Sequence, residues 1–214
     1  MTAGKSIGVL SLQGAFIEHI HRLKQLTDAT VLQVKTPEDL EKCHALIIPG
    51  GESTTISLVA QRSGLLEPLR AFCNNPNKAV WGTCAGMILL SKEAMKTMRG
   101  GQELFGGMDI TVNRNQYGSQ IESFQADLQF NCLSTDESFN AIFIRAPILH
   151  SYDQDKGIIE LASLIDNPID NKLAPKGNVV ALRQFNKMCT SFHPELTQDK
   201  RLHEYFLKEI VFKL

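Results

Sequence analysis

Short apolar runs alternate with amphipathic stretches through the first half of the chain. The apolar runs predict strands at residues 6–12, 30–34, 44–48 and 79–82. Apolar positions at helical spacing, together with helix-start residues, predict helices that begin at Gly14 and Thr36 and others at 53–62 and 64–73. Strands that alternate with helices in this way are typical of a parallel sheet with helices on both faces.

The pattern changes from about Met108 onward, where the apolar runs become shorter. They predict added, partly antiparallel strands at residues 110–112, 120–124, 141–144, 157–164, 179–183 and 188–192. Polar, Gly- and Pro-rich composition predicts loops at 95–107 and 166–177, and the chain closes with a predicted helix at 197–212. Because no linker is long enough to separate domains, we expect one domain over residues 1–214, a three-layer α/β fold of flavodoxin-like character.

A candidate nucleophile lies at the junction between the fourth predicted strand and the next helix. Residues 82–86 read Gly-Thr-Cys-Ala-Gly, the nucleophile-elbow pattern with Cys84 in place of serine. Small residues must flank such a crowded turn, and the helix N-terminus behind it favours a thiolate. The alternative is an ordinary buried cysteine in a strand–helix turn.

A candidate base lies more than a hundred residues downstream, in the sequence His193-Pro194-Glu195. A cysteine nucleophile needs a base, and the base needs a group that orients it. Residues two apart in extended backbone point to the same side, so the carboxylate of Glu195 can reach the ring of His193. Taken alone, these three residues could equally form a polar turn after a strand.

The third predicted strand runs into a glycine turn at residues 49–53, Pro-Gly-Gly-Glu-Ser. Such a turn can direct a backbone N–H at a reacting carbonyl, because glycine adopts conformations that other residues resist. With the N–H of Ala85, just after the candidate nucleophile, it would complete a two-donor oxyanion hole. The same turn also reads as a plain helix start with Ser53 as N-cap.

The overall composition excludes several classes of function. Of the 214 residues, 43% are hydrophobic and 21% charged, and the net charge is −1, as in ordinary globular proteins. Without a basic stripe or a long apolar run, neither nucleic acid nor a membrane is an expected partner. Five scattered cysteines without a secretory signal pattern indicate reduced thiols and a cytoplasmic protein.

Metal chemistry is not expected from this sequence, and no cofactor is predicted. Neither C-x-x-C nor H-E-x-x-H occurs. His19 and His21 lie two positions apart in a helix-like stretch and therefore on different faces. We expect both to face solvent rather than to bind a metal.

The motifs at 49–53, 82–86 and 193–195 resemble those of the class I, triad glutamine amidotransferases. A longer set of motifs is similar to the glutaminase subunits of pyridoxal 5'-phosphate synthases, at residues 12–16, 51–54, 113–118, 143–147 and 190–195. Together these matches run from Ile7 to the final predicted helix. Five motifs in the same order form a specific signal, whereas any one alone would not.

The resemblance implies a role for each matching position. Cys84 matches the nucleophile, His193 the base and Glu195 its orienting group, and Gly51 and Ala85 match the oxyanion hole. The positions that match substrate-binding residues are Gly50, Gly51, Glu52, Arg114, Ile144 and Arg145. Arginine suits the α-carboxylate of glutamine, although surface charge is its more usual role.

Two further positions bear on the partner and on the pocket. Gln13 matches a residue near the oxyanion turn and the partner interface. Ser119 stands where the family usually has a second basic residue, and it is assigned no role. The electrostatics of the pocket or of the interface therefore differ at this point from the family pattern.

The implied reaction is hydrolysis of L-glutamine to L-glutamate and ammonia through a cysteine thioester. The resemblance also implies a partner, a separate (β/α)8-barrel synthase subunit that uses the ammonia to build pyridoxal 5'-phosphate. Two alternatives stay open at this point. One is another cysteine hydrolase of the same fold, such as a γ-glutamyl hydrolase or a peptidase, and the other is a catalytically silent regulatory subunit.

Overall fold

A seven-stranded sheet forms the centre of the computed structural model, which describes residues 4–95, 102–114, 123–135, 137–165 and 178–214. Its strand order is β10-β11-β12-β4-β3-β1-β2. The strands are β1 (Ser6–Leu10), β2 (Thr30–Val34), β3 (Ala45–Ile48), β4 (Ala79–Thr83), β10 (Ile158–Ser163), β11 (Val179–Gln184) and β12 (Lys187–Thr190). Five neighbouring strands pair in parallel, in the order β12, β4, β3, β1 and β2. At the β12 edge of this group, β11 and β10 pair in antiparallel fashion.

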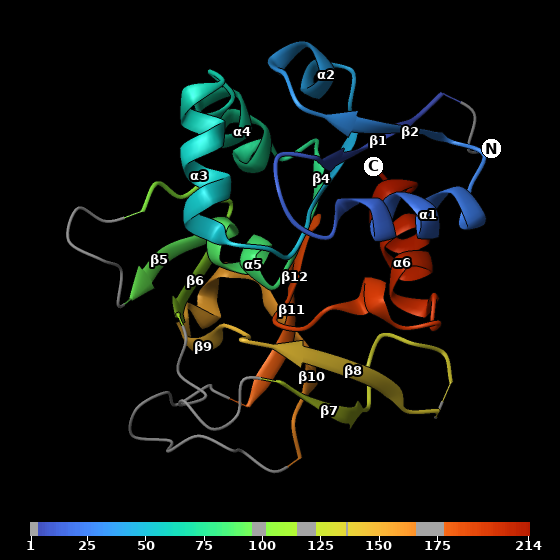
Figure 1. The fold of residues 1–214 in the computed structure, drawn as a ribbon. Coiled ribbons are helices and arrows are strands. Elements are labelled where there is room, and N and C mark those ends of the chain that lie inside the picture. The colour runs from blue at the N-terminus through green and yellow to red at the C-terminus, as the bar shows by residue number, and fades with distance from the viewer. Residues whose placement is uncertain (1–3, 96–101, 115–122, 136, 166–177) are drawn as a thin grey trace.

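Helices cover both faces of this sheet (Figure 1). They are α1 (Phe16–Leu26), α2 (Pro37–Glu41), α3 (Ser53–Arg62), α4 (Leu66–Asn74), α5 (Ala85–Leu90) and α6 (Arg201–Tyr205), the last continued by a π-helical segment, η3 (Phe206–Val211). Alternate residues of β3 explain the layers. Leu46 and Ile48 join the core under α3, α4 and α5, whereas Ala45 and Ile47 join the core under α1 and α6. The predicted three-layer α/β fold with a mostly parallel sheet is therefore confirmed.

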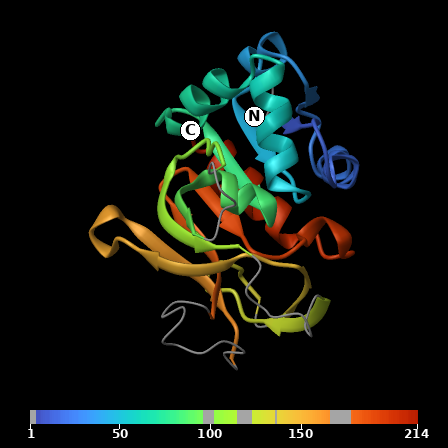
Figure 2. The same ribbon diagram turned by 60° about the vertical axis from the view of Figure 1, so that its left-hand side comes forward.

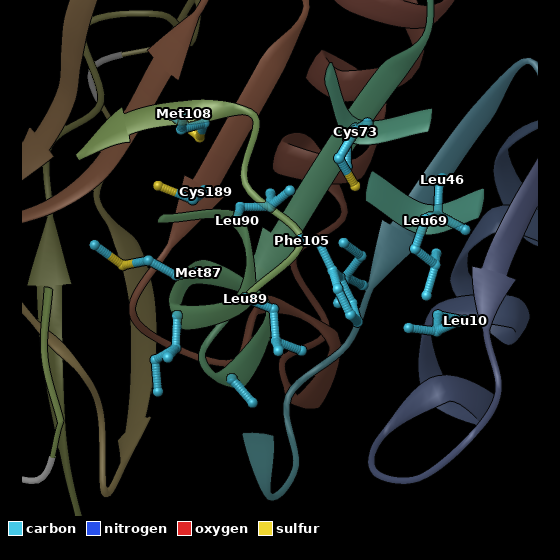
Figure 3. Close-up of a cluster of buried hydrophobic side chains, with 14 of the residues drawn as sticks. Leu10, Leu46, Leu69, Cys73, Met87, Leu89, Leu90, Phe105, Met108 and Cys189 are labelled. Atoms are coloured by element: carbon cyan, nitrogen blue, oxygen red, sulfur yellow. The ribbon is translucent and has the colours of Figure 1, made fainter. Parts of the chain in front are cut away.

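Figure 3 shows part of the first core, where Leu46 and Leu69 pack near Phe105 from the segment that follows β5. Large apolar side chains that are shielded from water in this way supply most of the favourable free energy of folding. This core closes one face of the sheet behind α5, so that the start of that helix is rigidly placed. The second core is rich in aromatic rings and includes Trp81 of β4 and Phe206.

Two smaller sheets lie at the end of the molecule away from α2 (Figures 1 and 2). One contains β5 (Ser91–Met95), β6 (Met108–Asn113) and β9 (Ile148–Tyr152), and the other pairs β7 (Ser123–Leu128) with β8 (Phe139–Ile144). Short 3-10 turns complete the elements, at η1 (Gln154–Lys156) and η2 (Pro194–Leu196). The end of β8 and η2 both reach the carboxyl edge of the central sheet, where the candidate site is found.

Most predicted elements are present, with differences at their ends. Thr36 caps α2 through a capping box with Asp39, as predicted from the sequence. Strands β5 and β9 were not predicted. The closing helix begins at Arg201 rather than at residue 197 because side chains hold the intervening residues in a turn: Thr197 Oγ1 accepts from the N–H of Asp199, and Asp199 Oδ1 accepts from the N–H of Arg201. The predicted loop at 166–177 and parts of the predicted segments 95–107 and 120–124 lie outside the described residues.

Candidate active site

Cys84 occupies a strained turn between β4 and α5. Its backbone φ is +48°, a conformation that non-glycine residues adopt rarely and mostly at functional sites. A Cβ on Gly82 would lie 2.5 Å from the backbone of Gly86, and a Cβ on Gly86 would lie 2.1 Å from the carbonyl oxygen of Ile48. Both glycines are therefore required sterically, and the elbow geometry predicted from the sequence is present.

His193 and Glu195 form a buried pair beside this turn. The Nδ1 of His193 lies 2.7 Å from the Oε1 of Glu195, and the Glu195 side chain has no exposed surface. Burial by itself lowers the pKa of His193, but the hydrogen bonds and charges of Cys84 and Glu195 outweigh it and raise that pKa to about 10. The arrangement favours an imidazolium that is paired with the sulfur on one side and the carboxylate on the other.

Gly50 packs directly behind the pair. A Cβ at this position would lie 2.3 Å from Cε1 of His193 and 3.3 Å from the Cβ of Cys84. Glycine at this position therefore allows the ring of His193 to approach Cys84. Gly50 supports the ring of His193 and is not among the residues that line the cavity described below, and its contact with substrate stays a prediction.

The glycine turn is held by the turn at residues 13–15. The carbonyl oxygen of Gly50 accepts a hydrogen bond of 3.0 Å from the N–H of Ala15. Because the peptide bond is trans, the N–H of Gly51 points to the opposite side, away from that turn. Gln13 adds a second contact, since its Oε1 accepts from the N–H of Glu52 at 2.8 Å. The predicted proximity of Gln13 to the oxyanion turn is therefore present.

A cavity of about 250 Å³ lies in front of Cys84. It is lined by Gln13, Gly51, Glu52, Ser53, Cys84, Ala85, Ile88, Arg114, Ile144, Arg145 and His193. Ligand pockets commonly measure ~300–1,000 Å³, so this one suits a molecule of amino-acid size. A larger cavity of about 660 Å³ between α4 and residues 102–109 contains none of the three candidate catalytic residues.

Glu52, and not Ser53, is the N-cap of α3, which corrects the interpretation of the glycine turn as a helix start. The Glu52 carboxylate accepts from the N–H of Thr54 at 3.0 Å and of Thr55 at 2.6 Å. Burial is the largest single effect and raises the pKa of Glu52, but the hydrogen bonds from Thr54 and Thr55 together outweigh it and lower that pKa overall. The Nη2 of Arg114 lies 3.4 Å from the Oε1 of Glu52. One wall of the cavity therefore carries a fixed anion beside a cation.

The opposite wall is built by the end of β8. The carbonyl oxygen of Ile144 lies 3.8 Å from the sulfur of Cys84, and Arg145 follows in a left-handed conformation with φ of +43°. A strained residue that follows directly on a pocket-lining carbonyl indicates a shape held for function. The predicted pocket residues Arg114, Ile144 and Arg145 are therefore brought together with Cys84, although they come from distant segments. Ser119 lies outside the described residues.

The other cysteines do not line this cavity, and three are buried while Cys132 is half-buried. Burial raises the thiol pKa to about 11 for Cys43 and Cys132 and to about 12 for Cys73 and Cys189. Such thiols are inert, since only the thiolate is a nucleophile. Within the described part of the chain, no group of three or more His, Cys, Asp or Glu residues could hold a metal ion. A search of the same residues finds no helix with the length and apolar character needed to cross a membrane.

The expectation that His19 faces solvent is wrong. His19 is fully buried, and its Nε2 lies 3.4 Å from the Oε2 of Glu195. The sequence did contain a signal, because Phe16, Ile20 and Leu23 form an apolar stripe at helical spacing and position 19 lies on that stripe. His21 is exposed, as predicted.

Comparison with known proteins places these features in a family context. Residues 9–212 match the model of the SNO glutamine amidotransferase family. The subunit PdxT of pyridoxal 5'-phosphate synthase from Herpetosiphon aurantiacus is 48% identical, over 94% of this chain and 98% of that protein. The subunit SNO1 from Saccharomyces cerevisiae is 42% identical, over 97% and 93%. A crystal structure described as a glutamine amidotransferase superposes with a TM-score of 0.80 at 40% identity, covering 96% of this chain and 98% of that one.

Proposed function

This chain belongs to the SNO glutamine amidotransferase family, and on that premise we propose that the site around Cys84 hydrolyses L-glutamine to L-glutamate and ammonia. The observation that carries the proposal is the strained cysteine turn beside the buried His193–Glu195 pair. Relatives named as pyridoxal 5'-phosphate synthase subunits indicate what the ammonia is for. The chain is the glutaminase of such a synthase and serves vitamin B6 biosynthesis.

The reaction runs in two stages at the same atoms. The Cys84 thiolate attacks the side-chain amide carbon of glutamine, and His193 gives a proton to the departing ammonia, which leaves a thioester. His193 then takes a proton from water, which attacks the thioester and releases glutamate. Each tetrahedral oxyanion is held by the N–H groups of Gly51 and Ala85. The N–H of Ala85 is available because the first N–H groups of a helix have no partner within it.

Substrate recognition follows from the charges on the cavity wall. The α-carboxylate of glutamine suits a bidentate arginine contact from Arg114 or Arg145, and the α-ammonium suits Glu52, whose carboxylate is fixed by its capping hydrogen bonds. A free amino acid carries both of these charges, whereas a residue within a peptide carries neither. The cavity is therefore better suited to glutamine than to a peptide substrate.

Ammonia then passes to a separate synthase subunit, a (β/α)8 barrel that binds this chain. The support is that these relatives are named as synthase subunits, together with the sequence resemblance. We propose that Gln13 couples the two, and the support is that the turn that contains it holds both the Gly50 carbonyl and the Glu52 N–H. The five unpaired cysteines fit a protein of the cytoplasm, and two cores that share one sheet support a single domain over residues 1–214.

The test is ammonia release from L-glutamine by the purified chain, alone and with the synthase added. We expect turnover that the synthase increases, and covalent labelling of Cys84 by a glutamine-like electrophile. Faster turnover of γ-glutamyl peptides than of glutamine would identify a different cysteine hydrolase. If no thioester can be trapped, and no ammonia is released with the synthase present, the chain is a regulatory subunit and the proposal is wrong.

A further inference from the structure

A cluster of buried side chains with polar atoms lies behind Glu195, on the side away from His193. It contains His19 of α1, His203 of α6 and Trp81 and Thr83 of β4, all without exposed surface. The rings of Trp81 and His203 are 4.8 Å apart, and those of His19 and His203 are 5.1 Å apart. Figure 1 shows α1 and α6 on the same face of the sheet, and the two helices are in contact. None of these residues lines the cavity in front of Cys84.

Glu195 has one oxygen that the catalytic pair does not use. Its Oε1 faces His193, whereas its Oε2 is buried and accepts no hydrogen bond within the described part of the chain. A buried carboxylate oxygen without a donor is costly. The Nε2 of His19 lies 3.4 Å from it, a few tenths of an ångström beyond a normal N–H···O distance of ~2.7–3.2 Å. The same Nε2 also lies 3.3 Å from the hydroxyl of Thr83, so a small rotation of the His19 ring is needed to direct its N–H at Glu195.

The contacts among the rings decide which nitrogen of His19 carries the proton. The Nδ1 of His19 lies 3.0 Å from the Nε2 of His203, so one of the two must donate to the other. If His19 donated, its bare Nε2 would face the Glu195 carboxylate with only the Thr83 hydroxyl able to donate to it. The remaining N–H of His203 would then be buried without a partner among the described residues. If His203 donates, His19 presents an N–H to Glu195, and the atom left unpaired is a bare ring nitrogen. The second arrangement avoids both penalties.

We propose that His19 is a positioning residue for the glutaminase reaction, whose Nε2–H holds the second oxygen of Glu195 and so fixes the carboxylate that orients His193. Thr83 supports the ring, with its hydroxyl 3.3 Å from the same Nε2. The inference rests on the proposed catalytic role of the His193–Glu195 pair and adds a residue to it. His19 touches neither substrate nor the reacting atoms, so it acts only through Glu195.

His19 and His203 are suited to this task because both are neutral. Burial, and then the nearby His203 and His193, lower the pKa of His19 well below its usual value. Burial, with a smaller effect of Arg22, lowers the pKa of His203 to about 3. A neutral donor orients Glu195 without cancelling its charge. The carboxylate therefore keeps its full charge to stabilise the imidazolium of His193.

Two amide substitutions separate this role from simple packing. The amide of His19→Gln lies at the distance of Nε2 along the side chain and can still donate to Glu195, whereas that of His19→Asn reaches only as far as Nδ1. His19→Leu removes both contacts. The exposed His21 on the same helix provides matched controls with the same three substitutions, none of which should change turnover.

The first readout is glutamine turnover by the complex with the synthase. We expect kcat to fall on the order of 10²-fold in His19→Asn and His19→Leu, the effect of misplacing a catalytic group by about 1 Å, with KM nearly unchanged. His19→Gln should recover most of this loss. Equal values of kcat for folded His19→Asn and His19→Gln, or a wild-type kcat in His19→Leu, would overturn the proposal.

The second readout needs neither turnover nor the partner. The rate at which iodoacetamide alkylates Cys84 follows its thiolate, and a poorly oriented carboxylate stabilises the thiolate–imidazolium pair less. The pH midpoint of alkylation should therefore rise by on the order of one unit in His19→Asn and not in His19→Gln. An unchanged midpoint in His19→Asn would reject the positioning role. Loss of turnover in Cys84→Ser tests the proposed function separately, since that result does not depend on His19.

A further pair of variants tests the same proposal without changing position 19, in case the His19 variants fail to fold. His203→Gln keeps a donor for the Nδ1 of His19, whereas His203→Leu removes it and lets His19 change tautomer. We expect His203→Leu to lower kcat and His203→Gln to stay close to wild type, with thermal melting used to confirm that each variant is folded. The opposite order would contradict the tautomer assignment.

Discussion

The substitution Glu195→Gln gives the most direct test of an N–H donor at His19, because that donor decides how the new amide is oriented. The new side-chain amide can be placed in two ways between Nδ1 of His193, which lies 2.7 Å from Oε1 of Glu195, and Nε2 of His19, which lies 3.4 Å from Oε2. With the amide oxygen toward His193, the base keeps its working tautomer, but two N–H groups face each other at His19. With the amide oxygen toward His19, all donors are satisfied, but the NH₂ group forces His193 into the tautomer that cannot accept a proton at Nε2.

The magnitude follows from these two orientations. A buried, unsatisfied donor costs about 1–3 kcal/mol, so a difference of about 2–3 kcal/mol leaves the competent tautomer in on the order of 1% of molecules. Loss of the carboxylate charge weakens the imidazolium further. The expected total is a fall in kcat on the order of 10⁴-fold, as when the orienting carboxylate of a serine protease triad is removed. His193→Asn should cost more, on the order of 10⁶-fold, because the base itself is lost, and KM should change little in either variant.

The assay is ammonia release at saturating glutamine with the synthase present, for Glu195→Gln in two backgrounds. Beside His19→Leu, the two amide orientations become nearly equal in free energy, since each leaves one amide atom unpaired. Glu195→Gln should therefore cost about 10- to 10²-fold less in that background than beside wild-type His19. Ring ¹⁵N chemical shifts of His193 report the tautomer directly. Equal losses in both backgrounds, or an unchanged tautomer, would refute the reasoning.

Three further outcomes are expected. Cys84→Ser should keep the melting temperature but lose at least ~10⁴-fold in turnover, and stoichiometric labelling of another cysteine by a glutamine analogue would contradict the assignment. Gln13→Ala should lower the rise in ammonia release on titration with the synthase by about 10²–10³-fold, the value of one oxyanion donor; a response like that of wild type would mean that Gln13 does not couple the subunits. Burial lowers the pKa of His203 to about 3 in the folded chain, against about 6.5 in the unfolded chain. Between these pH values the unfolded chain binds more protons. The free energy of unfolding therefore falls as pH decreases from about 6.5 toward 3, by up to ~1.4 kcal/mol per pH unit. Denaturant melts should show a shallower acid decline for His203→Leu; an equal decline would assign it to other groups.

The features that could be predicted from the sequence were encoded locally. The parallel strands are continuous apolar runs, and the elbow at Cys84 is marked by the two glycines that its close contacts require. The pocket residues were predicted only through the family resemblance. The glutamine amidotransferase assignment is confirmed by the family match. The roles of individual residues in catalysis stay predictions.

The features that could not be predicted depend on contacts between distant segments. Strand β9 was missed because its pairing with β6, and not its own composition, makes it a strand. Glu52 caps α3 in place of Ser53 because its longer side chain folds back onto Thr54 and Thr55. His19 was assigned to solvent because its spacing from His21 argued only against a shared metal site, whereas its partner His203 lies 184 positions away.

The burial of His19 also gives α1 an unusual place in the site. At its N-terminal end, the N–H of Ala15 holds the Gly50 carbonyl and so sets the direction of the Gly51 N–H. About 6 Å further along the helix axis, at ~1.5 Å per residue, His19 faces the second oxygen of Glu195. The helix and its N-cap therefore contact both the peptide that carries the proposed oxyanion donor and the carboxylate that is proposed to orient His193. Because a helix moves as a rigid unit, a partner that displaced α1 would change both catalytic functions together, and a partner that fixed it would set both at once.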